Sequence, residues 1–192
     1  MELKKIIILG VLLITFTVMS LIFFLGNGEE QIVPSQNLVV TDTEQQEPGQ
    51  VETEKVSLFF LSEEDGLLHP EEREIILTSS LHLKAMAIIE ELLKGSLNGL
   101  ISPFPPDAEL REFFLSADGT AYVDFSRAFQ DNHPSGASAE ISTVYSVVNT
   151  LIFNLDSIKK VFILIEGGEK ETLKGHIDLS RPFVPKFDLI VD

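Results

Sequence analysis

Cysteine is absent from this chain of 192 residues. Its absence excludes disulfide bonds, thiolate nucleophiles and thiolate metal ligands, and a lipid anchor would also require a cysteine. Tryptophan is absent too, and two tyrosines leave few aromatic platforms on which a glycan could stack. The folded part of the chain must therefore be held together by its own apolar core.

Basic residues are scarce in this sequence. Fourteen lysines and arginines stand against thirty aspartates and glutamates, which gives a formal net charge of −16. Residues 29–54 contribute seven acidic side chains and no basic one. Nucleic acid and anionic lipid need cations to neutralise their phosphates, so both are disfavoured as partners. A cationic or neutral partner fits better.

A long apolar run stands near the start of the chain. Residues 6–25 carry no charge and directly follow Lys4 and Lys5. As a helix this run would be about 30 Å long, the thickness of the hydrocarbon core of a bilayer. The positive-inside rule then keeps residues 1–5 in the cytoplasm and places everything after the run outside. The sequence predicts a single-pass protein of the cytoplasmic membrane, with a transmembrane signal anchor and an extracytoplasmic remainder.

Alternatives exist for this part of the chain. The run could be a cleaved secretory signal, with cleavage near residues 26–28, although it is longer than the usual apolar core of such signals. Residues 26–54 are rich in Glu, Gln, Thr and Pro and contain no aromatic residue. This composition predicts an acidic, disordered linker, and the alternative is a docking motif at residues 37–40.

Residues 55–192 show the patterns of one α+β domain. Apolar runs bounded by turn residues predict strands, and apolar residues that recur every three to four positions predict two amphipathic helices packed on sheets. Strands are expected at residues 56–61, 74–77, 109–115, 120–125, 160–165, 172–173 and 187–191. Helices are expected at residues 81–94 and 138–155. Prolines make residues 99–107 a loop, and the uninterrupted apolar run at 160–165 is typical of a central strand.

A short motif occurs twice in this domain. Residues 124–129 (DFSRAF) and 178–183 (DLSRPF) share Asp, Ser, Arg and Phe at four of six positions. A functional interpretation makes Arg127 and Arg181 a matched pair of donors to a ligand carboxylate. In the preferred structural interpretation, each copy is a turn at the end of a strand, and its phenylalanine packs on the core. The side-chain oxygens that accept backbone N–H groups in these turns belong to Asp124, Ser126, Asp178 and Ser180. The repeat also predicts two related α/β halves.

The order of several short motifs resembles one protein family. The matching segments are VSLFF at 56–60, Leu68 with Glu72 and Arg73, EELLKG at 90–95, YVDFS at 122–126 with Phe129, VNTL at 148–151, KVFILIEG at 160–167, and GHIDLS at 175–180 with Pro182. Each motif is weak alone, but together they resemble the GerMN domain of bacterial sporulation and germination proteins and of many other envelope proteins. The resemblance covers essentially residues 55–192.

This resemblance implies a non-catalytic, extracytoplasmic domain with an α+β fold similar to the ring-building modules of secretion and sporulation assemblies. Modules of that kind associate through helix and sheet faces. The chain departs from the sporulation protein of the family in two ways, because it has no cysteine for lipidation and shows one GerMN copy instead of two.

Residues that could perform chemistry are few and scattered. His176 and Asp178 could share one side of an extended segment, but a zinc site needs further ligands. The acids at residues 63–65 and 71–72 could bind calcium, although solvated acidic turns are the simpler explanation. No nucleophile elbow, zinc-protease motif or phosphate-binding glycine loop is present, and no glycosidase carboxylate pair stands out. The sequence therefore predicts no enzyme, no metal and no cofactor.

Two functions remain. The first is a membrane-tethered module that docks on another envelope protein or associates with itself, and it predicts an exposed apolar patch. The candidate docking residues are Arg127, Arg181, Phe104, Phe113, Phe114 and Phe129. The second is a peptidoglycan-binding or cell-wall remodelling protein, which predicts a groove with aromatic platforms and a carboxylate pair. The scarcity of tryptophan and tyrosine favours the first function.

Overall fold

The computed structural model describes residues 51–191. The expected cytoplasmic segment at 1–5, the membrane span at 6–25 and the linker as far as residue 50 lie outside the described residues. Within the described part, no helix combines the length and the apolarity needed to cross a membrane.

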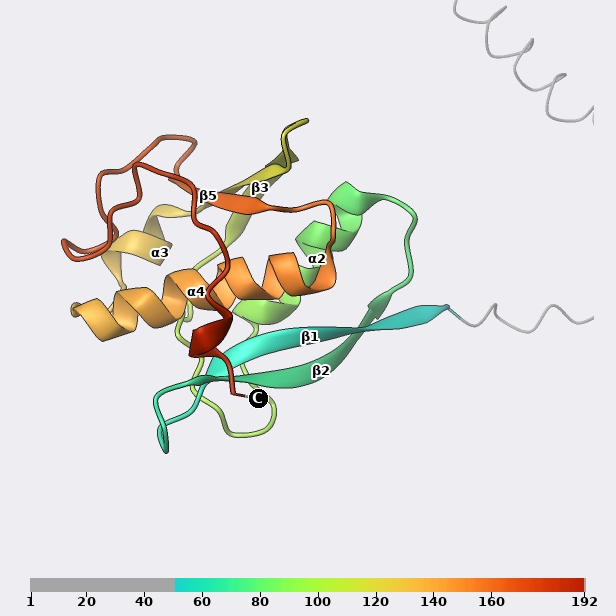
Figure 1. Cartoon of the computed structure of the whole chain (residues 1–192), viewed down its shortest axis with the longest axis horizontal. Coiled ribbons are helices and arrows are strands. Elements are labelled where there is room, and N and C mark those ends of the chain that lie inside the picture. The colour runs from blue at the N-terminus through green and yellow to red at the C-terminus, as the bar shows by residue number, and fades with distance from the viewer. Residues whose placement is uncertain (1–50, 192) are drawn as a thin grey trace, which may run out of the picture. The chain divides into compact units, whose positions relative to one another are not determined.

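The described chain folds as an α+β domain with two small sheets and helices, as the sequence predicts (Figure 1). Its strands are β1 (Thr53–Leu61), β2 (Leu68–Ile76), β3 (Leu110–Leu115), β4 (Thr120–Phe125) and β5 (Lys160–Ile165). Its helices are α2 (Leu81–Leu93), α3 (Arg127–Asp131), α4 (Ala137–Asn154) and the 3-10 turn η1 (Phe187–Leu189). Figure 1 shows α2 and α4 between the β1–β2 ribbon and the other three strands.

β1 and β2 form a long antiparallel ribbon. β1 starts at Thr53, so the last two residues of the expected linker belong to the domain. β2 starts at Leu68, whereas the sequence predicted a start at residue 74. The prediction was late because charged residues in β2 conceal an alternation of buried and exposed side chains. β2 contains Pro70, whose missing N–H is tolerated because β2 is an edge strand.

Side chains of α4 close the outer edge of β1. Ser146, Thr150 and Asn154 follow one another at intervals of four residues, which places them on one face of the helix. Asn154 accepts a hydrogen bond from the Ser57 N–H at 2.9 Å and donates one to the Ser57 carbonyl at 2.7 Å. Thr150 accepts from the Phe59 N–H at 3.2 Å, and Ser146 donates to the Phe59 carbonyl at 2.6 Å. The edge of β1 is thus bound by a helix instead of another strand.

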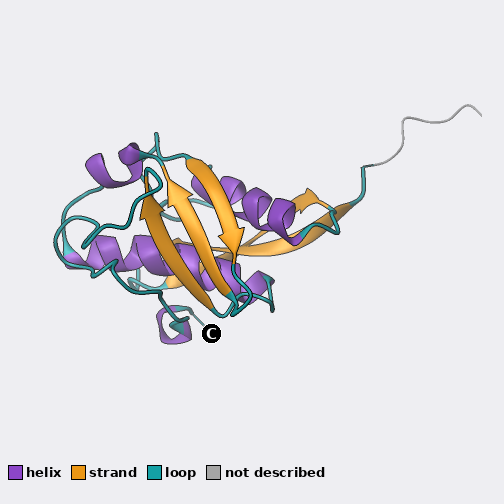
Figure 2. Cartoon of the chain, turned by 90° about the horizontal axis from the view of Figure 1, so that it is seen from above, coloured by secondary structure: helices purple, strands orange, loops and turns teal. Residues whose placement is uncertain are grey.

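The second sheet has the strand order β3-β4-β5 (Figure 2). β3 and β4 make the predicted hairpin, in which Gly119 adopts φ of 83°, a conformation that suits glycine. β4 and β5 run parallel. The prediction that β5 is central is wrong, because β4 holds that position. The apolar run of β5 is continuous because Phe162, on the outer face, is covered by Tyr122. The backbone of Val161, also on β5, is bridged to Phe183 of the C-terminal segment.

The core fills the space between the helices and both sheets. The helix prediction for α2 is confirmed to within one residue, and the helix stops where Gly95 adopts φ of 85°. α4 is also confirmed and contributes much of the core. Core side chains with at most 2% exposure include Leu58, Phe60, Ile88, Ile89, Leu92, Phe113, Val123, Phe125, Phe129, Val144, Val148, Leu151 and Ile163.

Several expectations for the rest of the domain are wrong. Residues 187–191 contain η1 in place of a strand, and residues 172–173 contribute an isolated bridge to Asp178. The helix α3 is not predicted by the sequence patterns. The repeated motif stands in two different settings, because residues 124–129 lead from β4 into α3, whereas residues 178–183 form no helix. The prediction of two related α/β halves is therefore wrong.

Candidate interaction surface

The four phenylalanines of the expected docking patch lie in two different environments. Phe104, Phe113 and Phe129 are 7%, 2% and 0% exposed. Phe129 stacks on Phe125 with 4.1 Å between ring centroids, and Phe104 lies 6.2 Å from Phe129. These three rings belong to the core, so they cannot line an exposed patch. Phe114 differs, because 60% of its surface is exposed.

Phe114 begins a row of aromatic rings across the three-stranded sheet. Its register partner on β4 is Tyr122, whose own partner on β5 is Phe162. The ring centroids of these two pairs are 6.2 Å and 5.5 Å apart. Successive residues of a strand face opposite ways, so the row lies on the side of the sheet opposite to the buried Phe113 and Val161. Figure 2 looks onto this outer face, with the helices behind the sheet.

β3 forms one edge of this sheet. The N–H of Phe113 donates to the side-chain carboxylate of its own neighbour, Glu112, at 3.2 Å. A groove of about 440 Å³ lies beside the start of β3, between the last turn of α2 and residues 106–110. The groove is lined by Glu90, Leu93, Lys94, Pro106, Ala108, Glu109 and Leu110. We call β3, the exposed ring of Phe114 and this groove together the β3 edge.

Sequence reasoning misses two of the three rings in the aromatic row. Tyr122 and Phe162 each lie between buried apolar neighbours, so their strands show no clean alternation. A signal was nevertheless present, because the Asp-Gly turn fixes the hairpin register and thereby pairs Phe114 with Tyr122. The partner on β5 depends on a parallel pairing across α4, and no local pattern specifies that register.

The first copy of the repeated motif connects β4 with two neighbouring segments. The Asp124 carboxylate accepts a hydrogen bond from the Gly167 N–H at 2.8 Å and lies 3.3 Å from the guanidinium of Arg111. Ser126 Oγ accepts from the Glu109 N–H at 3.1 Å. Both side chains therefore position loops next to the sheet, which is the role that the structural interpretation gives them.

The second copy makes a local turn. Asp178 accepts from the Ser180 N–H at 2.9 Å, and the Arg181 guanidinium donates to the same carboxylate at 2.8 Å. Hydrogen bonds from Ser180 and Arg181 lower the pKa of Asp178 to about 2. Arg127 is exposed, and its backbone N–H donates to Glu166. Among residues 51–191, no carboxylate binds both Arg127 and Arg181, so their use as a paired site stays a prediction.

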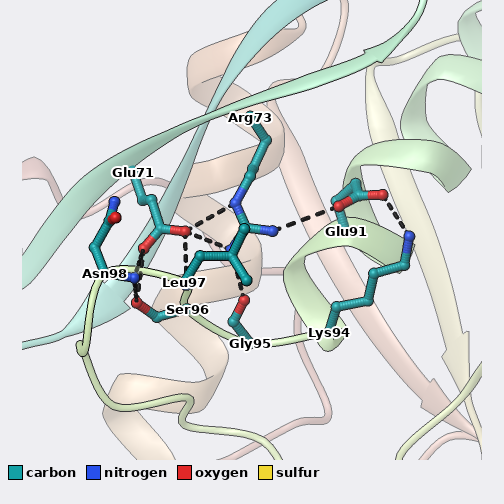
Figure 3. Close-up of polar contacts among 8 residues, drawn as sticks. All are labelled: Glu71, Arg73, Glu91, Lys94, Gly95, Ser96, Leu97 and Asn98. Atoms are coloured by element: carbon teal, nitrogen blue, oxygen red, sulfur yellow. Dashed lines mark hydrogen bonds and ion pairs between the residues drawn. The ribbon is translucent and has the colours of Figure 1, made fainter.

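Glu71 is the centre of a buried polar network at the end of α2 (Figure 3). Although it is charged, Glu71 is 2% exposed. Its carboxylate accepts hydrogen bonds from the Leu97 N–H at 3.0 Å, the Asn98 N–H at 3.2 Å and the Ser96 hydroxyl at 2.6 Å. The Nε of Arg73 donates to the same carboxylate at 2.8 Å. Glu71 therefore holds the loop that follows α2 against β2.

Arg73 extends this network to α2. Its guanidinium donates to the Gly95 carbonyl at 2.8 Å and lies 3.5 Å from Glu91. Burial by itself would raise the pKa of Glu71, but the hydrogen bonds, led by that from Ser96, outweigh it and hold the pKa below its ordinary value. Both carboxylate oxygens are engaged within the chain, so Glu71 serves as a loop anchor and not as an open calcium ligand.

Glu140 anchors a second loop from the first turn of α4. Its fully buried carboxylate binds Nδ1 of His176 at 2.6 Å and accepts from the Ile177 N–H at 3.0 Å. Burial would raise the pKa of Glu140, yet these hydrogen bonds lower it overall. His176 thus contacts Glu140 and not Asp178, which bonds within its own turn. Within residues 51–191, no cluster of three or more His, Cys, Asp or Glu side chains could hold a metal ion.

The two buried glutamates are unsuited to acid catalysis. A general acid that works near neutral pH needs a raised pKa, whereas the pKa of both Glu71 and Glu140 is lowered. Each carboxylate is also occupied by backbone N–H groups of a loop. The function of these two carboxylates that the structure shows is to position loops.

These features define a small α+β domain with two sheets and an exposed aromatic ring at one sheet edge. Over residues 57–171, more than half of its length, the chain matches the family model Germane, described as sporulation and spore germination. The chain therefore belongs to this family of GerMN domains. The resemblance found in the sequence motifs is confirmed.

Solved structures show the same fold. The first GerMN domain of the sporulation protein GerM from Bacillus subtilis is 24% identical, with a TM-score of 0.54, over 71% of this chain and 100% of that chain. The tandem GerMN domains of GerM match with 24% identity and a TM-score of 0.53, but this chain spans 48% of that structure. A protein of Clostridium perfringens titled a putative lipoprotein is 25% identical, with a TM-score of 0.50, over 70% and 89% of the two chains. No curated protein matches significantly.

Proposed function

We propose that this protein is a membrane-tethered, non-catalytic domain that binds another protein on the outer side of the bacterial cytoplasmic membrane. The observation that carries the proposal is the aromatic row, which ends at the edge of its sheet in the exposed ring of Phe114. Covering a large apolar side chain of this kind contributes about 1–2 kcal/mol to binding. A partner that covers Phe114 would extend the row of rings onto its own surface.

The location rests on independent observations. The uncharged run at residues 6–25 after Lys4 and Lys5 supports a signal anchor with the domain outside. Membership of the Germane family and the likeness to a protein titled a putative lipoprotein support a place in the envelope. The role of Glu71 and Glu140 as loop anchors supports a binding function over a catalytic one.

Protease accessibility tests the location. In intact cells without an outer barrier, an external protease should remove the domain from the full chain. A variant that lacks residues 6–25 should stay inside the cell and remain uncut until lysis. A full chain that resists the protease in intact cells but is cut after lysis would place the domain inside and contradict the proposal.

Crosslinking tests the function. A photoreactive phenylalanine replaces Phe114 in the full chain, and the control carries it at Phe187, which is 51% exposed on η1. We expect irradiation of cells to join position 114, and not position 187, to a discrete envelope protein. Adducts to peptidoglycan alone, or release of muropeptides from purified cell wall by the protein, would favour the cell-wall alternative.

A further inference from the structure

We propose that the β3 edge accepts a fourth strand from the partner, and that this strand is basic, with an apolar residue placed against Phe114. This inference rests on the proposed function and names the class of its partner. Addition of a peptide strand to an exposed sheet edge next to a helix is a recurrent mode of recognition, in which backbone hydrogen bonds supply affinity and side chains supply specificity.

Each of the other strands with a free edge in residues 51–191 has part of that edge engaged within the chain. The edge of β1 is bound by Thr150 and its neighbours on α4. β2 lacks a donor at Pro70, and its start pairs with the C-terminal segment, where the Val191 N–H donates to the Leu68 carbonyl at 3.0 Å. β5 is bridged to Phe183. In the described chain, no other strand and no side chain of a helix makes a hydrogen bond to the backbone along the outer edge of β3.

Phe113 shows that the backbone of β3 faces outward for part of its length. Its N–H is bound by the carboxylate of Glu112 and therefore does not pair with β4. Because backbone direction alternates along an antiparallel strand, the backbone of Leu115 faces outward as well. The contact to Glu112 is 3.2 Å long, and an incoming carbonyl could replace it. The carboxylate released in this exchange would then bind a cation on the new strand.

The helix α2 runs alongside β3 and provides a second wall. Near the start of the helix, the ring of His82 lies 5.9 Å from that of Phe113, and its Nε2 lies 4.0 Å from the Glu112 carboxylate. Near the end of the helix, Leu93 and Leu110 line the groove of about 440 Å³. Figure 2 shows β3 as an outer strand of the three-stranded sheet, with helix behind the sheet. An extended segment would thus enter between a strand edge and a helix.

Charge decides which kind of segment fits. Three glutamates, Glu90, Glu109 and Glu112, stand along the groove and the strand. The nearby cations are already paired, since Lys94 binds Glu91 and Arg111 lies 3.3 Å from Asp124. The chain carries a net charge of −16, so a second copy would meet long-range repulsion. A basic strand from a different protein is therefore the occupant that the charges favour.

The pleat of the sheet gives the spacing within that strand. Glu112 and Phe114 are two residues apart and lie on the same outer face of the sheet. Their cross-strand neighbours on an added strand would also be two residues apart and on the same face. We infer a segment in which a lysine or arginine and an aliphatic or aromatic residue are separated by one residue.

The test uses the full chain in detergent micelles and two synthetic peptides of alternating Val and Thr. The first peptide carries Lys and Phe two positions apart, and the second replaces Lys with Glu. We expect the first peptide to bind and to slow amide hydrogen exchange at Phe113 and Leu115. The charge reversal Glu112→Lys should weaken this peptide by about tenfold and favour the second peptide. The control Glu72→Lys, on an exposed site of β2, should change neither affinity.

The outcomes separate the inference from the proposed function. Equal binding of both peptides, or binding without protection in β3, would overturn the inference. Protection of β3 that increases with the concentration of the protein alone would identify a second copy as the occupant and would also overturn it. If position 114 crosslinks to an envelope protein while neither peptide protects β3, the proposed function stands and strand addition is wrong. If the peptide protects β3 while the domain lies inside the cell, strand addition stands and the proposed function is wrong.

Discussion

Along β1, the backbone groups of the outer edge are bound by hydroxyl and amide side chains of α4, whereas along β3 the Phe113 N–H is bound by the carboxylate of the preceding residue, Glu112. The first arrangement uses side chains of another element, of which Ser146 and Thr150 are buried. The second is local, and it involves a side chain that is 66% exposed. The hydrogen bonds from α4 are part of the fold, whereas the contact of Phe113 with Glu112 is the one that our proposal expects a partner strand to replace.

The same contrast extends to charged residues. On the ribbon, Glu71 is buried and fully bound, and it fixes a loop more than twenty residues away in the sequence. On the β3 edge, Glu90, Glu109 and Glu112 remain at the surface next to a groove. The buried Glu71 therefore serves the fold, and the exposed acidic groups along β3 are the ones that we propose to contact a basic partner.

The largest effect should come from the two neighbouring phenylalanines of β3. Phe113→Ala removes a ring that is 2% exposed and leaves a cavity, so we expect the free energy of unfolding to fall by about 3–5 kcal/mol. Phe114→Ala removes a ring that is 60% exposed and should change it by at most about 0.5 kcal/mol. Urea unfolding followed by circular dichroism measures both. Similar losses for the two variants would show that the outer face of β3 belongs to the core.

Glu71→Ala should lower the free energy of unfolding by a similar or slightly smaller amount than Phe113→Ala. The change leaves the guanidinium of Arg73 and the N–H groups of the loop without their acceptor, which costs about 3–5 kcal/mol for a buried charged partner. The matched control is Glu72→Ala, the next residue, whose side chain is 69% exposed and pairs with Lys55 in solvent. In urea unfolding, the control should have the same free energy of unfolding as the original chain. Equal stability of the two variants would remove the contrast between buried and exposed charged residues.

The hydrogen bonds between α4 and the edge of β1 can be tested with a substitution that preserves the shape of the side chain. Thr150→Val keeps the volume of the side chain but removes the acceptor of the buried Phe59 N–H, so we expect a loss of about 1–3 kcal/mol. Ser142→Ala is the control, because that hydroxyl bonds within α4 to the carbonyl of Ser138. Hydrogen exchange adds a direct readout, since the Phe59 amide should exchange faster in the first variant and at the original rate in the second. Unchanged exchange at Phe59 would mean that the helix does not protect the edge of β1.

Local patterns predicted the parts of the fold that depend on neighbours in sequence. The amphipathic helix α2 was expected at residues 81–94 and is found at Leu81–Leu93, because its apolar spacing and Gly95 are both local signals. The β3–β4 hairpin follows from an Asp-Gly turn for the same reason. β2 was placed too late because Glu71 looks like a solvated acid, and its buried partners lie on a loop beyond α2.

The candidate site was predicted less well than the fold. Composition cannot tell which of several phenylalanines faces the core, so three core rings were expected at the surface with Phe114. The repeated motif misled for a related reason. Its second copy contains Pro182 and is followed by Pro185, which remove two backbone donors, and it leaves an isolated bridge instead of a sheet. Identical side chains therefore make a helix start in one copy and a local turn in the other.

The smallest expected effect concerns pH and the segment between α3 and α4. His133 is 3% exposed. Its Nδ1 lies 2.6 Å from the Pro134 carbonyl and its Nε2 lies 2.6 Å from the Thr143 hydroxyl, whose oxygen is 2.7 Å from the Pro103 carbonyl. Burial lowers the pKa of His133 below its ordinary value of 6.5, although Glu140 partly opposes this. The unfolded chain then binds a proton that the folded chain resists. Stability from this group is therefore complete above about pH 6.5 and is lost as the pH falls further.

We therefore expect the free energy of unfolding to decrease between about pH 7.5 and about pH 5.5, a window above the range in which the lowered pKa values of Glu71 and Glu140 act. His133→Gln should flatten this slope, whatever the substitution itself costs at neutral pH. Urea unfolding at several pH values gives the slope directly. Because the hydrogen bonds of His133 go to Pro134 and Thr143 and to no residue of the β3 edge, peptide binding at that edge should keep the same pH dependence in His133→Gln as in the original chain. A binding profile that changes with this substitution would show that the two regions are coupled and not independent.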